Sequence, residues 1–376
     1  MARIVVLSRR SITSPLSGGA CRYIHEIFRR LAAHHSITIL SGGWNGRNSI
    51  EEIDGITYHH FSGTFHRILL PIRYVANFAN KTDLLIDNSD VGIPWLSPLY
   101  TRVPRITIIH QLVREIFYDE FPRPISDLGF TLEPLMYRLY SKSKIVAASQ
   151  STAQDLIHCG IPSRNIEIVE PGCSDPGFPR MAMRERSART IGCVTRLMKY
   201  KGLQLAFRAL SKVVTSFPDV ELLVAGSGPY HGELSRITES LGISKNVHFL
   251  GRISEESKFK LYGQTRLAIY PSCREGFGIS VIEANSMGTP VVAWDAPGSR
   301  DSIVDGTTGL LAPFPDEAAF ADRICTLLTD DETWLSLSNS ARKWAREHSW
   351  DKSAKDFERV VEKALAEQDP EISLVY

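Results

Sequence analysis

Short apolar runs alternate with amphipathic segments along the first half of this chain. Six runs predict buried strands: Arg3–Ser8, Ser36–Leu40, Ile56–Phe61, Asp83–Asp87, Arg105–Ile109 and Lys144–Ala148. Between the first two, residues 18–33 place apolar side chains at helical spacing. Ser149 is a predicted N-cap for a helix over Thr152–Cys159. Strands that alternate with helices in this way predict a mostly parallel sheet with helices on both faces.

The same alternation restarts in the second half. The predicted strands are Ile191–Thr195, Glu221–Ala225, Val247–Leu250, Leu267–Tyr270 and Pro290–Trp294, with helices over 202–217, 230–241, 255–263 and 279–287. The intervening segment, residues 170–188, is rich in proline and glycine and has no period, so it is the predicted linker. We therefore expect two doubly wound α/β domains, residues 1–173 and 174–350, with a ligand cleft at the carboxyl ends of their strands.

Composition narrows the class of protein. Of the 376 residues, 43% are hydrophobic and 23% are charged, as in soluble globular proteins, and a formal net charge of +1 gives no field for binding nucleic acid. The six cysteines are scattered without metal-ligand spacing. No apolar run approaches the roughly 20 residues of a membrane-spanning helix. We expect reduced thiols and a cytoplasmic protein.

The most informative segment runs from Glu275 to Ala293. Glu275 and Glu283 lie eight positions apart, with Gly276-Phe277-Gly278 and the start of a predicted helix at Ile279 between them. A strand, a glycine turn and a helix N-terminus form a phosphate cradle, because the first helical N–H groups have no partner within the helix. Carboxylates beside an anion site would normally repel the anion. Their presence is explained if they face hydroxyl groups: one carboxylate faces the ribose of a nucleotide, and the other faces a sugar attached to the diphosphate of that nucleotide.

A second segment, Thr195-Arg-Leu-Met-Lys-Tyr-Lys201-Gly, follows a predicted strand and precedes a helix. Arg196 and Lys201 are suited to hold a diphosphate and to stabilise it as it departs, because arginine offers a bidentate fork and lysine a point charge. A solvated basic loop is the alternative.

These motifs, with Gly288-Thr-Pro-Val-Val after them, resemble the donor site of the retaining GT-B glycosyltransferases of family 4. The resemblance covers most of the chain and is strongest over residues 192–311. It implies a GT-B fold, two Rossmann-like domains facing a cleft, with a final helix over 351–370 that packs back on the N-terminal domain. The family usually has glycine where this chain has Thr195.

The resemblance also assigns roles within a donor-binding site. The catalytic candidates are Glu275, Arg196, Lys201 and His110. The donor-binding candidates are Gly18, Gly19, Arg196, Lys201, Gly226, Ile253, Glu275, Gly276, Phe277, Gly278, Ile279 and Glu283. Glu283 is assigned to the ribose, and Glu275 and His110 to the donor sugar. Three structural alternatives stay open. His110 can be a satisfied strand end, Gly226 a tight turn, and Glu283 an acid that compensates a helix dipole.

The predicted activity is transfer of a hexose, from GDP-mannose or a UDP-hexose, to a glycan or lipid-linked acceptor. The nucleotide sugar is a substrate; no cofactor and no metal are expected, since the chain has no Asp-x-Asp motif. A nucleotide-sugar epimerase and a non-catalytic nucleotide-sugar-binding subunit are the alternatives. Residues 64–74 and 112–140 mix apolar, aromatic and basic side chains, which indicates either a membrane surface as a further partner or ordinary amphipathic core helices.

Overall fold

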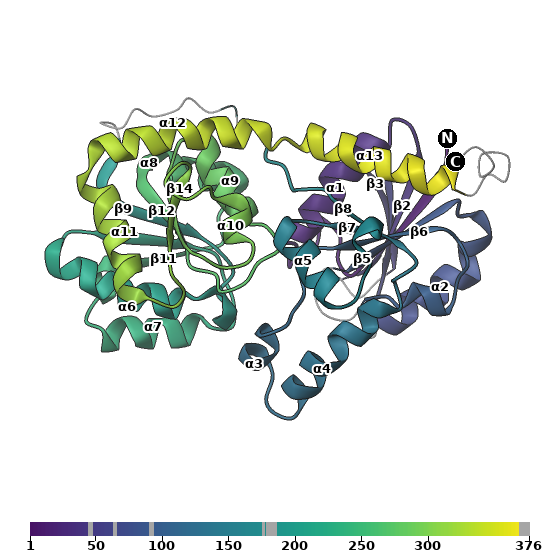
Figure 1. Cartoon of the computed structure of the whole chain (residues 1–376), viewed down its shortest axis with the longest axis horizontal. Helices are drawn as coiled ribbons and strands as arrows, with labels where there is room; N and C mark the ends of the chain where they lie inside the picture. Colours follow the sequence, from purple (N-terminus) through teal and green to yellow (C-terminus); the bar gives the residue numbers. More distant parts are fainter. Residues whose placement is uncertain (44–47, 63–65, 90–93, 175–176, 178–185, 368–376) are drawn as a thin grey trace. The chain divides into compact units, whose positions relative to one another are not determined.

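The computed structural model describes residues 1–43, 48–62, 66–89, 94–174, 177 and 186–367. The chain forms two compact units (Figure 1), one of Met1–Gly172 with Trp350–Tyr376 and the other of Cys173–Ser349. We call them unit 1 and unit 2. Of the predicted linker, residues 175–176 and 178–185 lie outside the described residues, and so do residues 64–65 of the first predicted membrane segment.

Unit 1 is built on an eight-stranded sheet. Its strands are β1 (Arg3–Ser8), β2 (Ser36–Gly42), β3 (Ser49–Ile53), β4 (Ile56–Phe61), β5 (Leu84–Ser89), β6 (Arg105–Ile109), β7 (Lys144–Ala147) and β8 (Ile166–Ile168). Their order is β3-β4-β2-β1-β5-β6-β7-β8. All pairs are parallel except β3 with β4. The chain thus winds outward from β1 in one direction and from β5 in the other.

Unit 1 also contains six α-helices within the described residues. They are α1 (Gly19–Leu31), α2 (His66–Asn77), α3 (Ile116–Glu120), α4 (Ile125–Arg138), α5 (Gln150–His158) and α13 (Trp350–Ala366). Ser149 caps α5 by accepting a hydrogen bond from the Thr152 amide, as predicted. The C-terminal α13 packs on α1, where Phe28 and Phe357 meet edge to face at 5.2 Å. Arg30 and Asp351 pair at 2.5 Å beside this contact.

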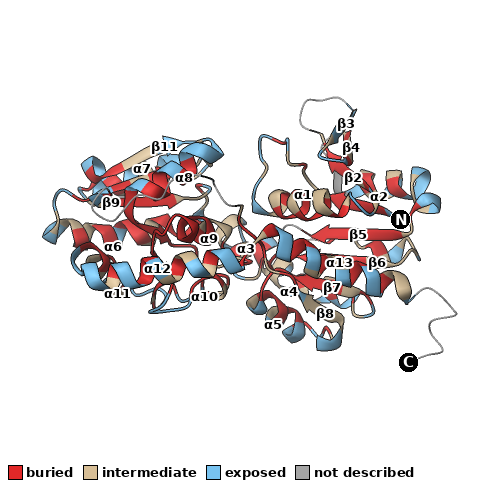
Figure 2. Cartoon of the chain, turned by 90° about the horizontal axis from the view of Figure 1, so that it is seen from above, coloured by how far each residue is buried: buried red, intermediate tan, exposed pale blue. Residues whose placement is uncertain are grey.

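Unit 2 holds a six-stranded parallel sheet. Its strands are β9 (Ser187–Val194), β10 (Glu221–Ala225), β11 (Val247–Gly251), β12 (Thr265–Tyr270), β13 (Val291–Trp294) and β14 (Gly309–Ala312), in the order β11-β10-β9-β12-β13-β14. Figure 2 shows the inner strands of both units as mostly buried, with exposed residues on the outer faces of the helices.

The helices of unit 2 lie on both faces of the sheet. They are α6 (Leu203–Ser216), α7 (His231–Ser240), α8 (Glu255–Gln264), α9 (Ile279–Ser286), α10 (Ser299–Ser302), α11 (Glu317–Thr329) and α12 (Asp331–Glu347). One buried cluster joins the sheet to α6 and α11 and contains Trp294 and Phe320, whose rings are 4.3 Å apart. A second cluster joins the other face to α8 and α9 and contains Tyr262 and Ile282. Because both faces of the sheet are covered, most residues of the inner strands are apolar.

Each sheet has a point where the winding direction reverses. In unit 1 it lies between β1 and β5, and in unit 2 between β9 and β12. In doubly wound proteins, ligands bind at the carboxyl edge of the sheet at such a reversal point.

Candidate active site

Lys201 and Glu275 meet at the reversal point of unit 2. Lys201 ends a short 3-10 turn (Lys199–Lys201) in the loop after β9, and Glu275 lies in the loop after β12. The Lys201 ammonium donates to Oε1 of Glu275 in an ion pair. Two predicted site residues that are 74 positions apart in sequence are thus joined directly.

Both side chains of this pair are largely shielded from water, with 10% of Lys201 and 14% of Glu275 exposed. Burial alone lowers the pKa of the Lys201 ammonium, but attraction to the Glu275 carboxylate outweighs it and holds that pKa above its usual value. The Lys201 ammonium therefore stays charged at the carboxyl edge of the sheet, where the Glu275 carboxylate compensates it. Such a charge can stabilise an anionic leaving group.

Arg196 lies near the start of the same loop and is exposed. Its guanidinium donates to the Tyr200 hydroxyl at 2.8 Å, and Tyr200 is itself buried beneath the Lys201 ammonium, 4.9 Å from the ring centroid. Tyr200 therefore links the two predicted cations, which makes the solvated-loop alternative a poor description of this segment.

The predicted glycine turn precedes α9. Gly276, Phe277 and Gly278 are buried, and Gly278 is the residue before the helix, which begins at Ile279. Gly298, from the loop after β13, closes over the turn with a φ of +85°. A Cβ at Gly298 would lie 2.6 Å from the Glu275 carbonyl oxygen, so only glycine allows this approach. Gly298 was not predicted.

Glu283 is buried in unit 2 and paired with a cation that was not predicted. It lies in the middle of α9, is 4% exposed, and pairs with the Lys258 ammonium of α8 at 2.6 Å. The dipole interpretation is therefore wrong, because the carboxylate faces a buried cation. Lys258 also pairs with Glu255 at 2.8 Å. Sequence reasoning missed Lys258, for which the only signal was its position one turn into a capped helix.

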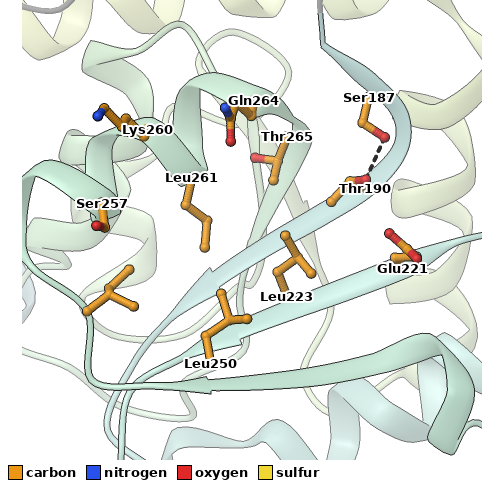
Figure 3. A pocket seen from close by; sticks show the side chains of 11 residues that line it. Ser187, Thr190, Glu221, Leu223, Leu250, Ser257, Lys260, Leu261, Gln264 and Thr265 are labelled. Carbon is orange, nitrogen blue, oxygen red and sulfur yellow. Dashed lines mark hydrogen bonds between the residues drawn. The ribbon is translucent and has the colours of Figure 1, made fainter.

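Gly226 and Ile253 lie beyond the ends of β10 and β11. Gly226 has a φ of +139°, and a Cβ there would lie 1.8 Å from the Thr195 carbonyl oxygen. Its amide donates to the Gly251 carbonyl at 2.7 Å, so the tight-turn explanation accounts for this glycine. Ile253 lines a cavity of about 590 Å³ between α8 and the strands β9, β10 and β11 (Figure 3). Of the predicted site residues, Ile253 alone is part of this lining.

The other three predicted residues belong to unit 1. Gly18 and Gly19 are exposed at the start of α1, where Gly18 is the N-cap. His110 directly follows β6 and is 8% exposed. Its Nε2 is 2.8 Å from Oδ1 of Asn88, a residue of β5 that the sequence did not single out.

Two further observations concern metal ions and membranes. Across the described residues, no cluster of three or more histidine, cysteine, aspartate or glutamate side chains is arranged to hold a metal ion. Within that same part of the chain, every helix is too short or too polar to span a bilayer.

Matches to two known protein families cover most of the chain. Residues 184–344 match the family described as glycosyl transferases group 1, and residues 17–175 match Glycosyltransferase Family 4. A D-inositol 3-phosphate glycosyltransferase of Corynebacterium glutamicum is 29% identical over 299 residues, covering 74% of this chain and 71% of that protein. A GDP-mannose-dependent alpha-(1-6)-phosphatidylinositol monomannoside mannosyltransferase of Mycolicibacterium smegmatis is 25% identical, covering 88% and 91%.

Solved structures show the same fold. Anabaena HepE in complex with UDP-glucose superposes with a TM-score of 0.77 at 18% identity, covering 96% of this chain and all of the other. The sucrose-phosphate synthase of Thermosynechococcus elongatus gives a TM-score of 0.79, also at 18% identity, and covers 98% of this chain. The predicted GT-B architecture is confirmed. The chain is a glycosyltransferase, whose second half matches glycosyl transferases group 1 and whose first half matches Glycosyltransferase Family 4.

Proposed function

We propose that this enzyme moves a hexosyl group from a nucleoside-diphosphate sugar to a hydroxyl of a glycan or lipid-linked acceptor, with retention of anomeric configuration. The observation that carries the proposal is the Lys201–Glu275 pair at the reversal point of unit 2, beside Arg196 and the turn that opens α9. The names of two similar proteins, one GDP-mannose-dependent and one bound to UDP-glucose, support GDP-mannose or a UDP-hexose as the donor.

In the proposed reaction the bond between the anomeric carbon and the diphosphate oxygen breaks first. The leaving diphosphate gains negative charge, which Arg196 and Lys201 neutralise without a metal ion. The acceptor oxygen then bonds to the anomeric carbon from the same face, and its proton passes to the diphosphate. A front-side substitution of this kind needs no carboxylate nucleophile beneath the sugar, in contrast to double displacement.

The remaining residues are proposed to position the donor. Glu275 accepts hydrogen bonds from hydroxyls of the hexose and Glu283 from the ribose diol, since a carboxylate can accept from two neighbouring hydroxyls. Amide groups at the start of α9 bind the diphosphate. His110 contacts the donor sugar and Gly18 and Gly19 its phosphate, as the family resemblance implies.

An acceptor at a lipid surface is supported by α4. Ile125, Leu128, Leu132, Leu135 and Leu139 recur at helical spacing and are 40–60% exposed. Because these apolar side chains face solvent, they support a membrane surface over a core helix for this face. Exposed Arg123, Arg138 and Lys142 lie at the two ends of the stripe. Apolar insertion combined with attraction to anionic lipid suits such a helix, and we propose that α4 binds the membrane surface that carries the acceptor.

The decisive experiment for the activity is a donor panel. Purified protein is incubated with UDP-, GDP- and ADP-hexoses and with inositol 3-phosphate or a phosphatidylinositol mannoside as acceptor, and both products are analysed. Release of a nucleoside diphosphate together with an α-linked product supports the proposal. An altered nucleotide sugar without nucleoside diphosphate identifies an epimerase. Donor binding without turnover across the panel identifies a binding subunit.

Membrane binding is tested separately by co-sedimentation with vesicles of anionic or zwitterionic lipid. Replacing Leu128 and Leu135 with serine should abolish binding to anionic vesicles. Leu335→Ser is the matched control, because Leu335 is a leucine of α12 in unit 2 that is 49% exposed. Equal binding by both variants would refute the role of α4.

A further inference from the structure

Helix α4 has two faces of opposite character. Its exposed apolar stripe lies on the outer face, whereas Ser126, Glu133 and Tyr137 are buried. Glu133 and Tyr137 are one helical turn apart, so they share the inner face. Glu133 is 0% exposed. Acidic side chains are almost never fully buried unless they are paired, so this carboxylate needs donors from elsewhere in unit 1.

The donors are two successive backbone amides in the loop after β6. The Val113 amide donates to Oε1 of Glu133 at 2.7 Å, and the Arg114 amide donates to Oε2 at 2.9 Å. Successive amides that converge on one group form the kind of concavity in which a backbone binds anions. Here the anion is a side chain of the protein itself. Glu133 thus holds main-chain atoms that are 20 and 19 positions away in sequence.

Arg114 is attached to α4 a second time through its side chain. Its φ is +45°, in the left-handed region that residues with a side chain rarely occupy. Its guanidinium donates to the Phe130 carbonyl of α4 at 3.2 Å and lies 3.9 Å from the centroid of the Phe130 ring. Glu133 therefore fixes the main chain of Arg114, and Phe130 fixes its side chain. Together these contacts hold a backbone conformation that is unfavourable by itself.

Apolar packing joins the same two segments. Tyr137 belongs to one buried cluster with Ile109, the last residue of β6, and with Leu112 in the loop after it. The inner face of α4 therefore meets this loop through both apolar and charged groups. The loop itself lies at the carboxyl edge of the sheet, because it follows the end of β6. β6 is the neighbour of β5, which borders the reversal point of unit 1.

We propose that Glu133 is a positioning residue that joins the membrane-facing helix α4 to residues 111–114. The helix and the loop then move as one body, so that a lipid-linked acceptor held at α4 is presented at the carboxyl edge of unit 1. The use of this arrangement by an acceptor rests on the proposed function. The attachment itself does not, because it consists of hydrogen bonds and packing within unit 1. A carboxylate suits this task because it accepts from both amides at once.

Hydrogen exchange of the full-length protein, measured by mass spectrometry on peptides that cover residues 111–114, tests the attachment without any substrate. Glu133→Gln keeps the shape of the side chain but turns an NH2 group toward an amide donor, so exchange there should be about tenfold faster or more. Asp127→Asn is the matched control, because Asp127 is an acid of the same helix that is 49% exposed. It should leave these rates unchanged. Unchanged rates in Glu133→Gln, or equal acceleration in Asp127→Asn, would overturn the proposal.

A second variant separates the carboxylate from the guanidinium. Arg114→Gly removes the side-chain contact to Phe130, and glycine adopts a positive φ without strain, so this variant should fold. Glu133 can still accept from both backbone amides, so slow exchange over residues 111–114 should be retained. Exchange about tenfold faster than in the unsubstituted protein would show that the guanidinium holds the loop, and would overturn the role of Glu133.

Kinetics show whether the attachment serves the acceptor. With phosphatidylinositol mannoside in phosphatidylglycerol vesicles as the acceptor, Glu133→Gln should lower kcat/KM for that acceptor by about tenfold or more. Its Kd for UDP and GDP should be unchanged, because the diphosphate is proposed to bind to cations of unit 2. An equal loss of nucleotide affinity, or an unchanged acceptor kcat/KM, would show that Glu133 is merely structural. If the unsubstituted protein forms no product, the proposed function fails, while the exchange rates still decide whether Glu133 fixes the loop.

Discussion

The buried pair of Lys258 and Glu283 offers the sharpest test of how unit 2 is held together. Only 8% of the Lys258 side chain and 5% of the Glu283 side chain are exposed, and their charged atoms are 2.6 Å apart. Lys258 also reaches Glu255, whose side chain is 64% exposed. Removing one partner of the pair therefore has a different consequence from removing the other. Removing the carboxylate leaves Lys258 with Glu255, whereas removing the lysine takes away the cation that compensates a buried carboxylate.

This asymmetry sets the expected magnitudes. Lys258→Met should lower the free energy of unfolding by about 3–5 kcal/mol, as for a buried pair that loses one partner. Glu283→Gln should lower it by about 1.5–3 kcal/mol, the scale of a hydrogen bond to a charged group. The double variant removes both charges from the interior. The double variant should recover much of the unfolding free energy that Lys258→Met loses, because no uncompensated charge remains in the interior.

Urea unfolding of the full chain, followed by tryptophan fluorescence, measures these differences. Lys260→Met is the matched control, since Lys260 lies on the same helix and pairs with Glu256 at 2.6 Å, but both side chains are more than half exposed. That surface pair should contribute less than about 1 kcal/mol. Two results would refute a stabilising role for the buried pair: equal losses of unfolding free energy in Lys258→Met and Lys260→Met, or a double variant that is less stable than Lys258→Met. Donor KM should also rise in Lys258→Met, because the carboxylate proposed to bind ribose loses its orientation.

Other predictions concern the site and the thiols. Arg196→Ala or Lys201→Ala should reduce kcat by roughly a hundredfold or more, the scale of one lost electrostatic contact in a transition state; unchanged kcat in both would exclude the leaving-group role. The pKa of Lys201 is raised above 10.5, so the stability that its charge contributes is fully present below that pH and lost only as pH rises through the higher folded value. The unfolding free-energy difference between wild type and Lys201→Met should therefore stay constant between about pH 7 and 9. Activity should survive EDTA, and loss that Mn²⁺ or Mg²⁺ restores would contradict the metal-free proposal. Burial raises the pKa of Cys193 to about 12 and that of Cys159 to about 11, so both thiols should resist a disulfide reagent at pH 8 until the protein unfolds.

Most strands of the fold could be predicted because they are compact apolar runs. The predicted β1 and β4 coincide with the structure at both ends, since polar residues or turns bound them on either side. β3 was not predicted. It is an edge strand, Ser-Ile-Glu-Glu-Ile, whose only pairing is an antiparallel one with β4 and which has no buried residue, so its sequence lacks the apolar signal of the inner strands.

The short elements near the end of unit 2 were also missed. β14 and α10 have four residues each, too few for a period to be recognised. α11 and α12 do carry start signals, since Asp316 and Asp330 cap them through their side chains. No element was predicted between Trp294 and the final helix over 351–370, although these two capping residues mark helix starts there.

The candidate site shows where sequence patterns stop being informative. The motifs identify Glu275 and Glu283 equally well, yet Glu275 faces Lys201 from another loop and Glu283 faces Lys258 from another helix. Which cation each acid meets depends on how α8 packs against α9 and on which strands are neighbours. Neither relation is encoded in the spacing of the motif itself. The His110–Asn88 contact was missed for the same reason, since it depends on β5 and β6 lying side by side.

The order of the strands explains the most important of these contacts. β9 begins unit 2 and the chain moves outward through β10 and β11 before β12 returns to the other side of β9. That return brings the Glu275 loop to the Lys201 loop, and it gives one ammonium two proposed tasks: to hold the carboxylate that binds the hexose, and to hold the diphosphate that leaves it. Lysine has three N–H donors and can serve both. The loss of kcat expected for Lys201→Ala therefore belongs to the pair, because removing the lysine also releases Glu275 from its position.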